Sequence, residues 1–471
     1  MKKIPGSQLI NNSTSSSQVA QKHVRYFYQP INVYKNWANR NIFLAGLAVF
    51  SFFLFFYGIT SRGGLQLSDE VTVFATGLSL ATRGSLAIDQ LQNLQNSLSI
   101  GQIGRDNHLY GKYFPGNVIS VALVYKLAEK QNDQSYFIDG YEAAPSITGV
   151  TWAIKINAFY GAVALTALFF LLKRYFDWKT TIITVLLLGL CSDWWYQSRG
   201  FLSEVGAGAF LMVCLCFAAY KKPYLSSLAL ALSILFRPTN IIALPIWGYA
   251  FWRSGRKAIW SVLFVVAGLC ALAFYNWIRF SSPFNFGYSS IERFGSSVLF
   301  GLYGILLSPG RSIFIYSPVL TLAIPGAWSF YKKEKILTII CTITILAYLV
   351  IIASWYSWEG GVSWGSRLLT PIVPILGFLV ASTIEFALKN KRDMIVVGIF
   401  AILGFSVEII ALARDPIRVM NEQVFNGSIH YGWTLHTVQY SWLVLQIKSL
   451  QNWRLCDLDA NPLRYFLGHC P

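Results

Sequence analysis

Two adjacent acids, Asp69 and Glu70, stand shortly after a long apolar run, residues 42–60. Carboxylates close to a lipid bilayer are costly and are uncommon there without a function. A carboxylate held in a fixed position at such a boundary could do chemistry. A structural explanation is also open. A helical apolar pattern comes after the pair and stops at Gly84, which favours Asp69 as the N-cap of a helix.

A second group of polar residues lies in GRDNHLYGKYFPGN, residues 104–117. Lys112 stands between Tyr110 and Tyr113, and an ammonium group in this setting can hold a phosphate. A belt of interfacial aromatic side chains with one snorkelling lysine explains the same residues without chemistry. The following Pro115 predicts the start of a new helix.

Five further candidates lie near the predicted ends of apolar segments: Asp193, Glu204, Arg311, Glu359 and Arg367. Glu204 stands at the start of an apolar run, and a partly buried acid usually has a partner or a function. Glu359 is followed by two glycines, which let a ligand approach the backbone closely.

The sequence contains no signature of a soluble enzyme. It has no phosphate-binding glycine loop, no zinc motif and no serine elbow. Three histidines in predicted loops, His108, His430 and His436, do not have metal-ligand spacing. Direct use of ATP or of a nucleotide sugar is therefore not expected.

The composition is that of a membrane protein. Of 471 residues, 55% are hydrophobic and 13% are charged, and the mean hydropathy is +0.48. Soluble domains carry roughly 25% charged residues. A net charge of +17 would suggest nucleic acid for a soluble protein. Here no basic stretch alternates with exposed aromatic residues, so we expect lysine and arginine in short cytoplasmic loops and no nucleic-acid partner.

Eleven segments are apolar and long enough, or nearly long enough, to cross a bilayer. They are residues 42–60, 151–172, 180–198, 203–220, 223–237, 239–252, 258–276, 313–330, 335–354, 367–388 and 394–412. The fifth and sixth are split by Pro238, which interrupts helical hydrogen bonding; one kinked span is the alternative. The predicted fold class is therefore all-α, a polytopic membrane protein with about 11 transmembrane helices.

The basic clusters test this map. With the N-terminus in the cytoplasm, five clusters fall on the cytoplasmic side, as the positive-inside rule requires: residues 173–179, 221–222, 253–257, 332–335 and 389–393. Residues 61–150 then form a large first extracytoplasmic loop with interfacial helices. The run 117–130 is short and carries two lysines, which favours a helix at the interface over a further span.

The map divides the chain into three regions. Residues 1–41 are polar, basic and of low complexity, which predicts a disordered cytoplasmic tail. Residues 42–412 form the transmembrane domain, and 413–471 form a short extracytoplasmic tail. Cys456 and Cys470 lie in this tail, where an oxidising compartment would let them pair.

Several of these stretches, in this order, resemble motifs of the GT-C glycosyltransferases, polytopic enzymes that use lipid-linked sugars. The chain is most similar to the branch near the protein mannosyltransferases and aminoarabinose transferases (glycosyltransferase family 39-like). SDE (68–70) resembles the acidic pair of the family's first outer loop. GKYFPG (111–116) resembles a KYPPG-like stretch except at Phe114, and SRGFLSEV (198–205) resembles an SR.LFSEP-like stretch except at Val205.

The resemblance implies an inverting transfer of a hexose or pentose from a polyprenyl phosphate-linked donor, on the outer face of the plasma (inner) membrane. The acceptor would be a hydroxyl or amine of an unidentified lipid, glycan or protein. Asp69 would be the general base, Glu70 would orient it or bind a divalent cation, and Glu204 is the second candidate base. Whether Mg²⁺ or Mn²⁺ takes part stays open.

The other candidate residues would hold the donor. Lys112, with Arg311 or Arg367, would bind its phosphate. Four residues would line the substrate site: Tyr110, Tyr113, Asp193 and Glu359.

Two other functions are open. A transporter or flippase for lipid-linked sugars or glycolipids predicts acids at mid-membrane and helices broken in two repeated halves, whereas these acids cluster on one predicted face. A glycan polymerase or ligase predicts a large loop late in the chain, whereas the longest loop is early. The glycosyltransferase requires Asp69, Lys112 and Glu204 around one cavity.

Overall fold

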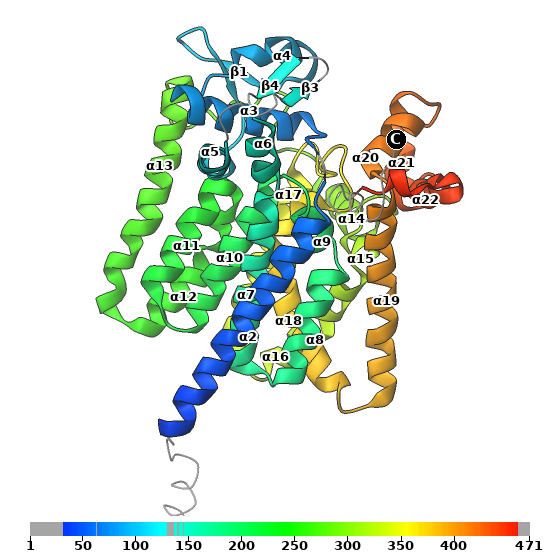
Figure 1. The fold of residues 1–471 in the computed structure, drawn as a ribbon. Helices are drawn as coiled ribbons and strands as arrows, with labels where there is room; N and C mark the ends of the chain where they lie inside the picture. The colour runs from blue at the N-terminus through cyan, green and yellow to red at the C-terminus, as the bar shows by residue number, and fades with distance from the viewer. Residues whose placement is uncertain (1–31, 63, 130–135, 139–140, 145, 460–471) are drawn as a thin grey trace, which may run out of the picture. The chain divides into compact units, whose positions relative to one another are not determined.

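The computed structural model describes residues 32–62, 64–129, 136–138, 141–144 and 146–459. The chain divides into two units, residues 1–45 and 46–471, and α2 (Asn32–Ile59) contains the boundary between them. Residues 1–31 of the predicted tail, and Cys470 of the predicted disulfide, lie outside the described residues. Helices predominate in the second unit, which holds every candidate residue (Figure 1).

Six of the eleven predicted segments are helices long and apolar enough to cross a membrane. These six are Arg40–Ile59, Ile147–Tyr175, Ala258–Phe280, Lys335–Ala353, Arg367–Ala387 and Lys391–Ala413. Their elements are α2, α6 (Ile147–Ile154) with α7 (Ile156–Tyr175), η3 (Arg256–Ser261) with α13 (Val262–Phe280), α17 (Lys335–Ser354), η5 (Arg367–Ile372) with α18 (Val373–Ala387), and α19 (Lys391–Ala413). The chain is therefore a multi-pass membrane protein.

The other five predicted segments are shorter or interrupted helices. They comprise α8 (Trp178–Leu190) with α9 (Trp194–Ser198), α10 (Ser203–Ala219), α11 (Pro223–Phe236), η2 (Pro238–Ala243) with α12 (Leu244–Ser254), and α15 (Ile313–Tyr316) with η4 (Pro318–Leu322) and α16 (Ala323–Tyr331). The predicted break at Pro238 is confirmed, since α11 ends at Phe236 and a 3₁₀ turn begins at Pro238. α10 packs against both α7 and α11, so these helices are neighbours in the bundle.

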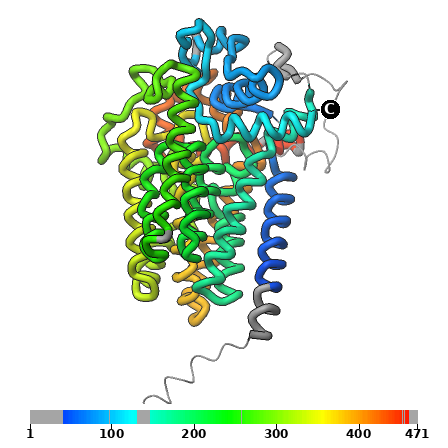
Figure 2. The backbone as a smooth tube through the Cα atoms, turned by 90° about the vertical axis from the view of Figure 1, so that its left-hand side faces the viewer, coloured from blue at the N-terminus to red at the C-terminus, as the bar shows by residue number. Residues whose placement is uncertain are grey.

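The segment between the first two spans lies across one end of the bundle (Figures 1 and 2). Its elements are α3 (Ser68–Arg83), η1 (Asp89–Leu91), α4 (Gln92–Leu98), the antiparallel pair β1 (Gly101–Ile103) and β2 (Leu109–Gly111), α5 (Pro115–Ala128), and the antiparallel pair β3 (Tyr136–Ile138) and β4 (Tyr141–Ala144). Gly84 ends α3 in the left-handed conformation with φ 64°, which confirms the predicted stop. α5 begins at Pro115, as predicted, and packs on α3.

Two regions are more structured than the sequence indicates. Residues 277–312 separate two of the predicted spans, 258–276 and 313–330, and within them 298–307 form α14 (Val298–Leu307). These ten residues are too few to span a bilayer, yet Gly301 lets the helix pack directly on the backbone of α17 at Ala353.

The segment after 413, predicted as a plain tail, is also folded. Its elements are α20 (Pro416–Met420), the π-helical η6 (Asn421–Phe425), α21 (Tyr431–His436), α22 (Trp442–Ser449), η7 (Leu450–Asn452) and η8 (Leu455–Asp457). Buried side chains of this segment, among them Met420 and Trp442, join Tyr196 and Trp364 in one apolar cluster. Burial of this apolar surface is what holds the segment on the bundle.

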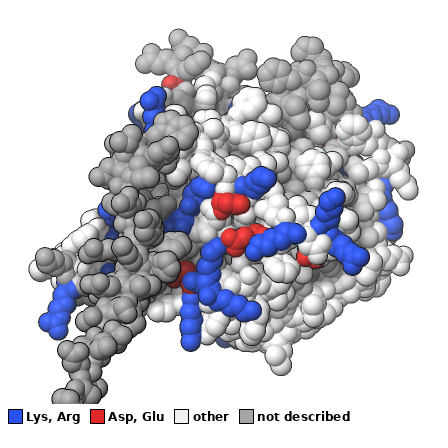
Figure 3. All heavy atoms as spheres, turned by 90° about the horizontal axis from the view of Figure 1, so that it is seen from below, with Lys and Arg blue, Asp and Glu red and all other residues white. Residues whose placement is uncertain are grey.

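The five predicted basic clusters meet at the other end of the bundle. The Arg174 guanidinium lies 5.0 Å from the Tyr220 ring, and Lys333 Nζ lies 4.4 Å from the Phe176 ring and 2.9 Å from a Glu385 carboxylate oxygen. Ser254 Oγ donates to the carbonyl of Lys221, which brings the turn before α13 beside the others. Figure 3 shows lysine and arginine side chains gathered on this face.

Candidate functional site

A cavity of about 690 Å³ lies at the end of the bundle that carries α3 and β2. Seven charged side chains line it, four cations and three carboxylates: Lys112, Arg237, Arg293, Arg367, Asp69, Glu204 and Glu292. They come from segments spread over three hundred residues of sequence. Aromatic residues of two loops, among them Tyr288 and Trp355, complete the wall.

Asp69 lies in the first turn of α3, and its carboxylate faces two donors. Tyr113 Oη donates to Oδ1 at 2.5 Å, and Arg367 Nη2 donates to Oδ2 at 2.8 Å. Burial by itself would raise the pKa of Asp69, but the Arg367 charge and the Tyr113 hydrogen bond outweigh it and hold this pKa below its usual range. The lowered pKa favours the ionised carboxylate, and the two hydrogen bonds fix its position. The side chain is also accessible, because 26% of it stays exposed.

Asp69 is not the N-cap that the sequence leaves open as an alternative. The N-cap of α3 is Leu67, and the carboxylate that accepts from backbone N–H groups at the start of the helix is that of Glu70. Glu70 Oε2 accepts from the backbone N–H of Gln66 at 2.8 Å and of Leu67 at 3.3 Å. Neighbouring residues of a helix point about 100° apart, so one acid faces the cavity and the other faces the chain before the helix.

Lys112 follows β2 and also lines the cavity. Its Nζ donates to the carbonyl of Ser99 at 3.0 Å and forms an ion pair with Glu292. The same ammonium lies 5.8 Å from the centre of the Tyr288 ring. A short turn between β2 and the proline that begins α5 therefore fixes Lys112 and Tyr113 side by side at the wall.

Glu204 lies in the first turn of α10 and is 4% exposed. Its partner is Arg237, whose Nη1 donates to Oε1 at 2.6 Å. Arg237 ends α11, directly before Pro238, and the break there turns its side chain back toward the start of α10. Arg237 and Glu292 are not among the residues predicted from the sequence, although an arginine beside a proline break at a helix end is a usable signal.

The other predicted site residues do not line the cavity. Arg311 is buried and donates to the carbonyls of Ser363 and Gly361, so it supports the loop 355–366. Glu359 accepts from Ser357 Oγ at 2.8 Å within that loop.

Two predicted substrate-lining residues also point elsewhere. Asp193 is buried, and both of its carboxylate oxygens accept from Gln197 Nε2 at 3.2 Å. Its backbone N–H donates to Ser317 Oγ at 2.8 Å, which ties the turn before α9 to the segment after α15. Tyr110 Oη donates to Asp106 Oδ2 at 2.6 Å, at the solvent side of the hairpin.

The histidines serve local structure. His108 Nδ1 lies 2.7 Å from Asp89 Oδ2, His430 accepts from the N–H of Gly432 as the N-cap of α21, and His436 stacks on Tyr303. Within the described part of the chain, no three His, Cys, Asp or Glu side chains are placed to hold a metal ion.

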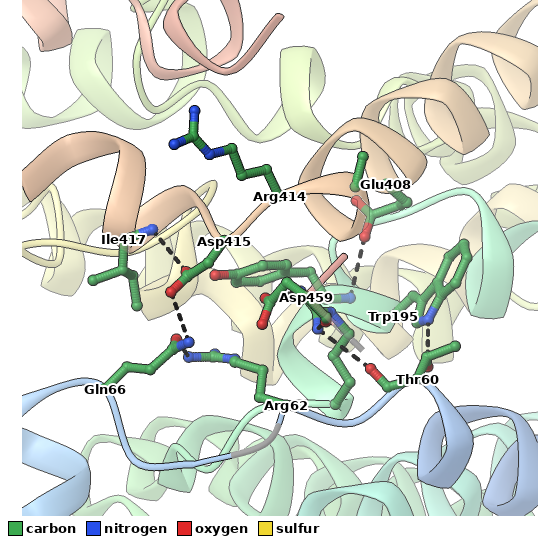
Figure 4. A network of polar contacts seen from close by, with 12 residues as sticks. Thr60, Arg62, Gln66, Trp195, Glu408, Arg414, Asp415, Ile417 and Asp459 are labelled. Atoms are coloured by element: carbon green, nitrogen blue, oxygen red, sulfur yellow. Dashed lines mark hydrogen bonds and ion pairs between the residues drawn. The ribbon is translucent and has the colours of Figure 1, made fainter. Parts of the chain in front are cut away.

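A second polar network joins Arg62 and Gln66, before α3, to Asp415 after α19 (Figure 4). Arg62 Nη1 donates to Gln66 Oε1 at 2.7 Å and lies 3.4 Å from Glu70 Oε1. Gln66 Nε2 in turn donates to Asp415 Oδ2 at 2.7 Å. Beside this chain of contacts, Arg199 Nη2 pairs with Asp459 Oδ2 at 2.6 Å. None of these side chains lines the cavity.

Asp415 gives this network a pH dependence. Burial, together with the nearby Asp459 carboxylate, raises the pKa of Asp415 to about 6 in the folded protein. In the unfolded chain the pKa of an aspartate is about 3.9. The free energy of unfolding therefore contains a contribution from Asp415 that is present at low pH and is lost as pH rises through about 6. Above that pH the folded protein must hold an ionised carboxylate in a buried position, which costs free energy.

We expect Asp415→Asn to gain thermal stability relative to the wild type as pH is raised from 5 to 7.5. Asparagine does not titrate, and any hydrogen bond that it loses to Gln66 is lost at both pH values and cancels. Unfolding midpoints of both proteins at the two pH values measure this. An unchanged difference between the midpoints would mean that Asp415 does not titrate in this range.

Comparison with known proteins finds solved structures that are similar to this chain. No family model and no curated protein matches the chain. The crystal structure of ArnT from Cupriavidus metallidurans in the apo state is similar to it, with a TM-score of 0.50 and 13% identity over 92% of this chain and 77% of that one.

Two further solved structures are similar at lower scores. ArnT from the same organism bound to undecaprenyl phosphate gives a TM-score of 0.46 and 12% identity, over 91% of this chain and 77% of that one. The oligosaccharyltransferase of Archaeoglobus fulgidus in the apo form gives 0.45 and 9%, over 77% and 56%. At these identities the first match shows a shared fold. The chain thus has the fold of the GT-C membrane glycosyltransferases.

Proposed function

We propose that this protein is a membrane glycosyltransferase that moves a sugar from a polyprenyl phosphate-linked donor to a hydroxyl or amine. The observation that carries the proposal is the convergence of Asp69, Lys112, Glu204 and Arg367 on one cavity. These four are the predicted acids and cations whose chemistry such a transfer needs. The ArnT likeness supports the fold in which they are placed.

The proposed reaction is a single displacement. The acceptor oxygen or nitrogen attacks the anomeric carbon, the bond from that carbon to the phosphate oxygen breaks, and the anomeric configuration inverts. Asp69 takes the acceptor proton, and the phosphate leaves as polyprenyl phosphate. Lys112 and Arg367 neutralise the charge that develops on the leaving oxygen. Glu204, held by Arg237, positions the acceptor.

A divalent cation has no prepared position among the described side chains. Each cavity carboxylate already has a cationic partner: Arg367 for Asp69, Arg237 for Glu204 and Lys112 for Glu292. A metal would have to displace one of them, so no step of the proposal uses a metal.

The proposed side of action is extracytoplasmic. The basic clusters lie at the end of the bundle away from α3, and lysine and arginine collect in cytoplasmic loops of membrane proteins. The cavity would then open on the outer face, where the phosphate of a lipid-linked donor can reach it. Labelling of Asp106→Cys by a membrane-impermeant thiol reagent in whole cells, against the unsubstituted protein, tests this placement.

The direct test is a panel of radiolabelled donors incubated with purified protein in nanodiscs, with and without EDTA. We expect release of polyprenyl phosphate from sugar monophosphate lipids, and none from nucleotide sugars, because the chain has no nucleotide loop. A parallel assay in sealed vesicles follows the intact lipid-linked sugar. Movement across the bilayer without cleavage of any donor would contradict the enzyme and support a transporter.

A further inference from the structure

The carboxylate of Glu292 forms an ion pair with Lys112, the cation that is proposed to bind the donor phosphate. Glu292 lies in the loop 281–297, between α13 and α14, and 9% of its side chain is exposed. Three donors face it: the Lys112 ammonium, Tyr356 Oη at 3.3 Å from Oε1, and the backbone N–H of Ser289 at 2.9 Å from Oε2. An ammonium, a phenol and a backbone amide are also donors that suit a phosphate group.

The backbone around Glu292 is hydrogen-bonded to other segments on both sides, whereas the N–H of Glu292 donates locally, to the carbonyl of Ser289 at 3.1 Å. On one side Gln102 Nε2 donates to the carbonyl of Tyr288 at 2.8 Å. On the other side the N–H of Tyr356 donates to the carbonyl of Arg293 at 3.1 Å, and the N–H groups of Gly295 and Ser296 donate to one carbonyl of α17. The short stretch 289–292 can therefore move without detaching the loop.

Two glycines bracket this region. Gly287 has φ 78° and Gly295 has φ 144°, conformations that other residues rarely adopt. Phe284, Ile291 and Phe294 of this loop are 84%, 75% and 55% exposed, while Tyr288 and Phe294 pack against Trp355. Phe284 and Phe294 also line the cavity, so a lipid-linked ligand that enters it would touch the same loop.

We propose that Glu292 is a displaceable internal anion that closes the phosphate site of this cavity, and that the phosphate of an incoming lipid displaces it from Lys112. This inference rests on the proposed function and deepens it. One ammonium cannot give its best contacts to both anions, so the donor phosphate and Glu292 compete. The loop 281–297 then opens when a phosphate-bearing lipid arrives and closes when it leaves.

The test is binding of farnesyl phosphate, with farnesol as the uncharged partner, measured by calorimetry on the full chain in detergent. Removal of an internal competitor raises the apparent affinity by the reciprocal of the fraction of time for which the site was open. We expect Glu292→Gln to lower the Kd for farnesyl phosphate about tenfold and to leave farnesol binding unchanged, if the site is closed for about nine-tenths of the time. Glu385→Gln is the matched control, because Glu385 is also paired with a lysine, Lys333, but at the other end of the bundle, and should not change either Kd.

A second variant separates displacement from a simple change of net charge. Glu292→Asp keeps the charge but shortens the side chain, so its contact with Lys112 weakens and the Kd should fall by a smaller factor. An unchanged Kd in Glu292→Asp with a lowered Kd in Glu292→Gln would overturn the proposal, as would weaker binding in both. If Glu292→Gln does not fold, Glu292→Asp alone decides. Absence of farnesyl phosphate binding by the wild type and both variants would instead count against the proposed function itself.

Discussion

Asp69→Asn is expected to lower the kcat of sugar transfer by about 10² to 10⁴ while leaving the protein folded. The amide keeps the size of the side chain and can still accept the Tyr113 hydrogen bond through its oxygen. It cannot take a proton from the acceptor. The Arg367 charge that lowers the pKa of Asp69 also keeps the wild-type carboxylate ionised, so the base is present throughout the neutral range. Initial rates at saturating donor measure the effect.

Asp106→Asn is the matched control for this variant. Asp106 is also an aspartate held by a tyrosine hydroxyl, at 2.6 Å from Tyr110, but it lies outside the cavity. The same substitution there should leave kcat within about threefold, because surface changes away from special features have small effects. A folded Asp69→Asn protein that keeps more than a tenth of wild-type activity would remove Asp69 as the base and leave Glu204 as the candidate.

Much of the fold could be predicted because membrane-spanning segments are recognised from the residues of the segment itself. Apolar runs of sufficient length mark the spans, and the breaks at Pro238 and Gly84 follow from backbone chemistry. The basic clusters could be assigned to one end for the same reason. The helix 298–307 could not be predicted, since it packs through Gly301 on α17, fifty residues away in the chain.

The site was predictable in part. Asp69, Glu204 and Arg367 carried a local signal, a charge near the end of an apolar run, and Lys112 carried another, an ammonium between two tyrosines. All four line the cavity. Arg311 carried the same signal but supports a loop by binding its carbonyls. Local pattern identifies a charge near the boundary; which way it points depends on tertiary packing.

The pairing of charges was not predictable at all. Arg237 meets Glu204 because α11 packs on α10, and Glu292 meets Lys112 because a loop 180 residues later folds over β2. Asp69 and Glu70 show the same limit at the shortest range. They are neighbours in sequence, yet one lines the cavity and the other binds Arg62 in the network beneath the C-terminal segment.

Arg199→Met should cause the largest loss of stability, about 3 to 5 kcal/mol, because it removes one partner of a buried ion pair. Arg199 is 2% exposed, and its guanidinium donates to the side chain and the carbonyl of Asp459. It also lies 4.9 Å from the centre of the Tyr196 ring. Methionine fills similar space but leaves the Asp459 carboxylate buried and unpaired. Thermal unfolding in detergent, followed by near-UV circular dichroism, measures the loss.

A double-mutant cycle with Asp459→Asn separates the ion pair from packing. If the unpaired carboxylate causes the loss, Arg199→Met/Asp459→Asn should be more stable than Arg199→Met alone. If the two effects simply add, the side-chain ion pair contributes nothing and the loss comes from the Tyr196 contact and the backbone carbonyls that Arg199 binds. Because neither residue lines the cavity, kcat of the folded variant at low temperature should stay close to wild type. A loss of kcat as large as that of Asp69→Asn would instead mean that the C-terminal segment positions the base through Arg62 and the start of α3.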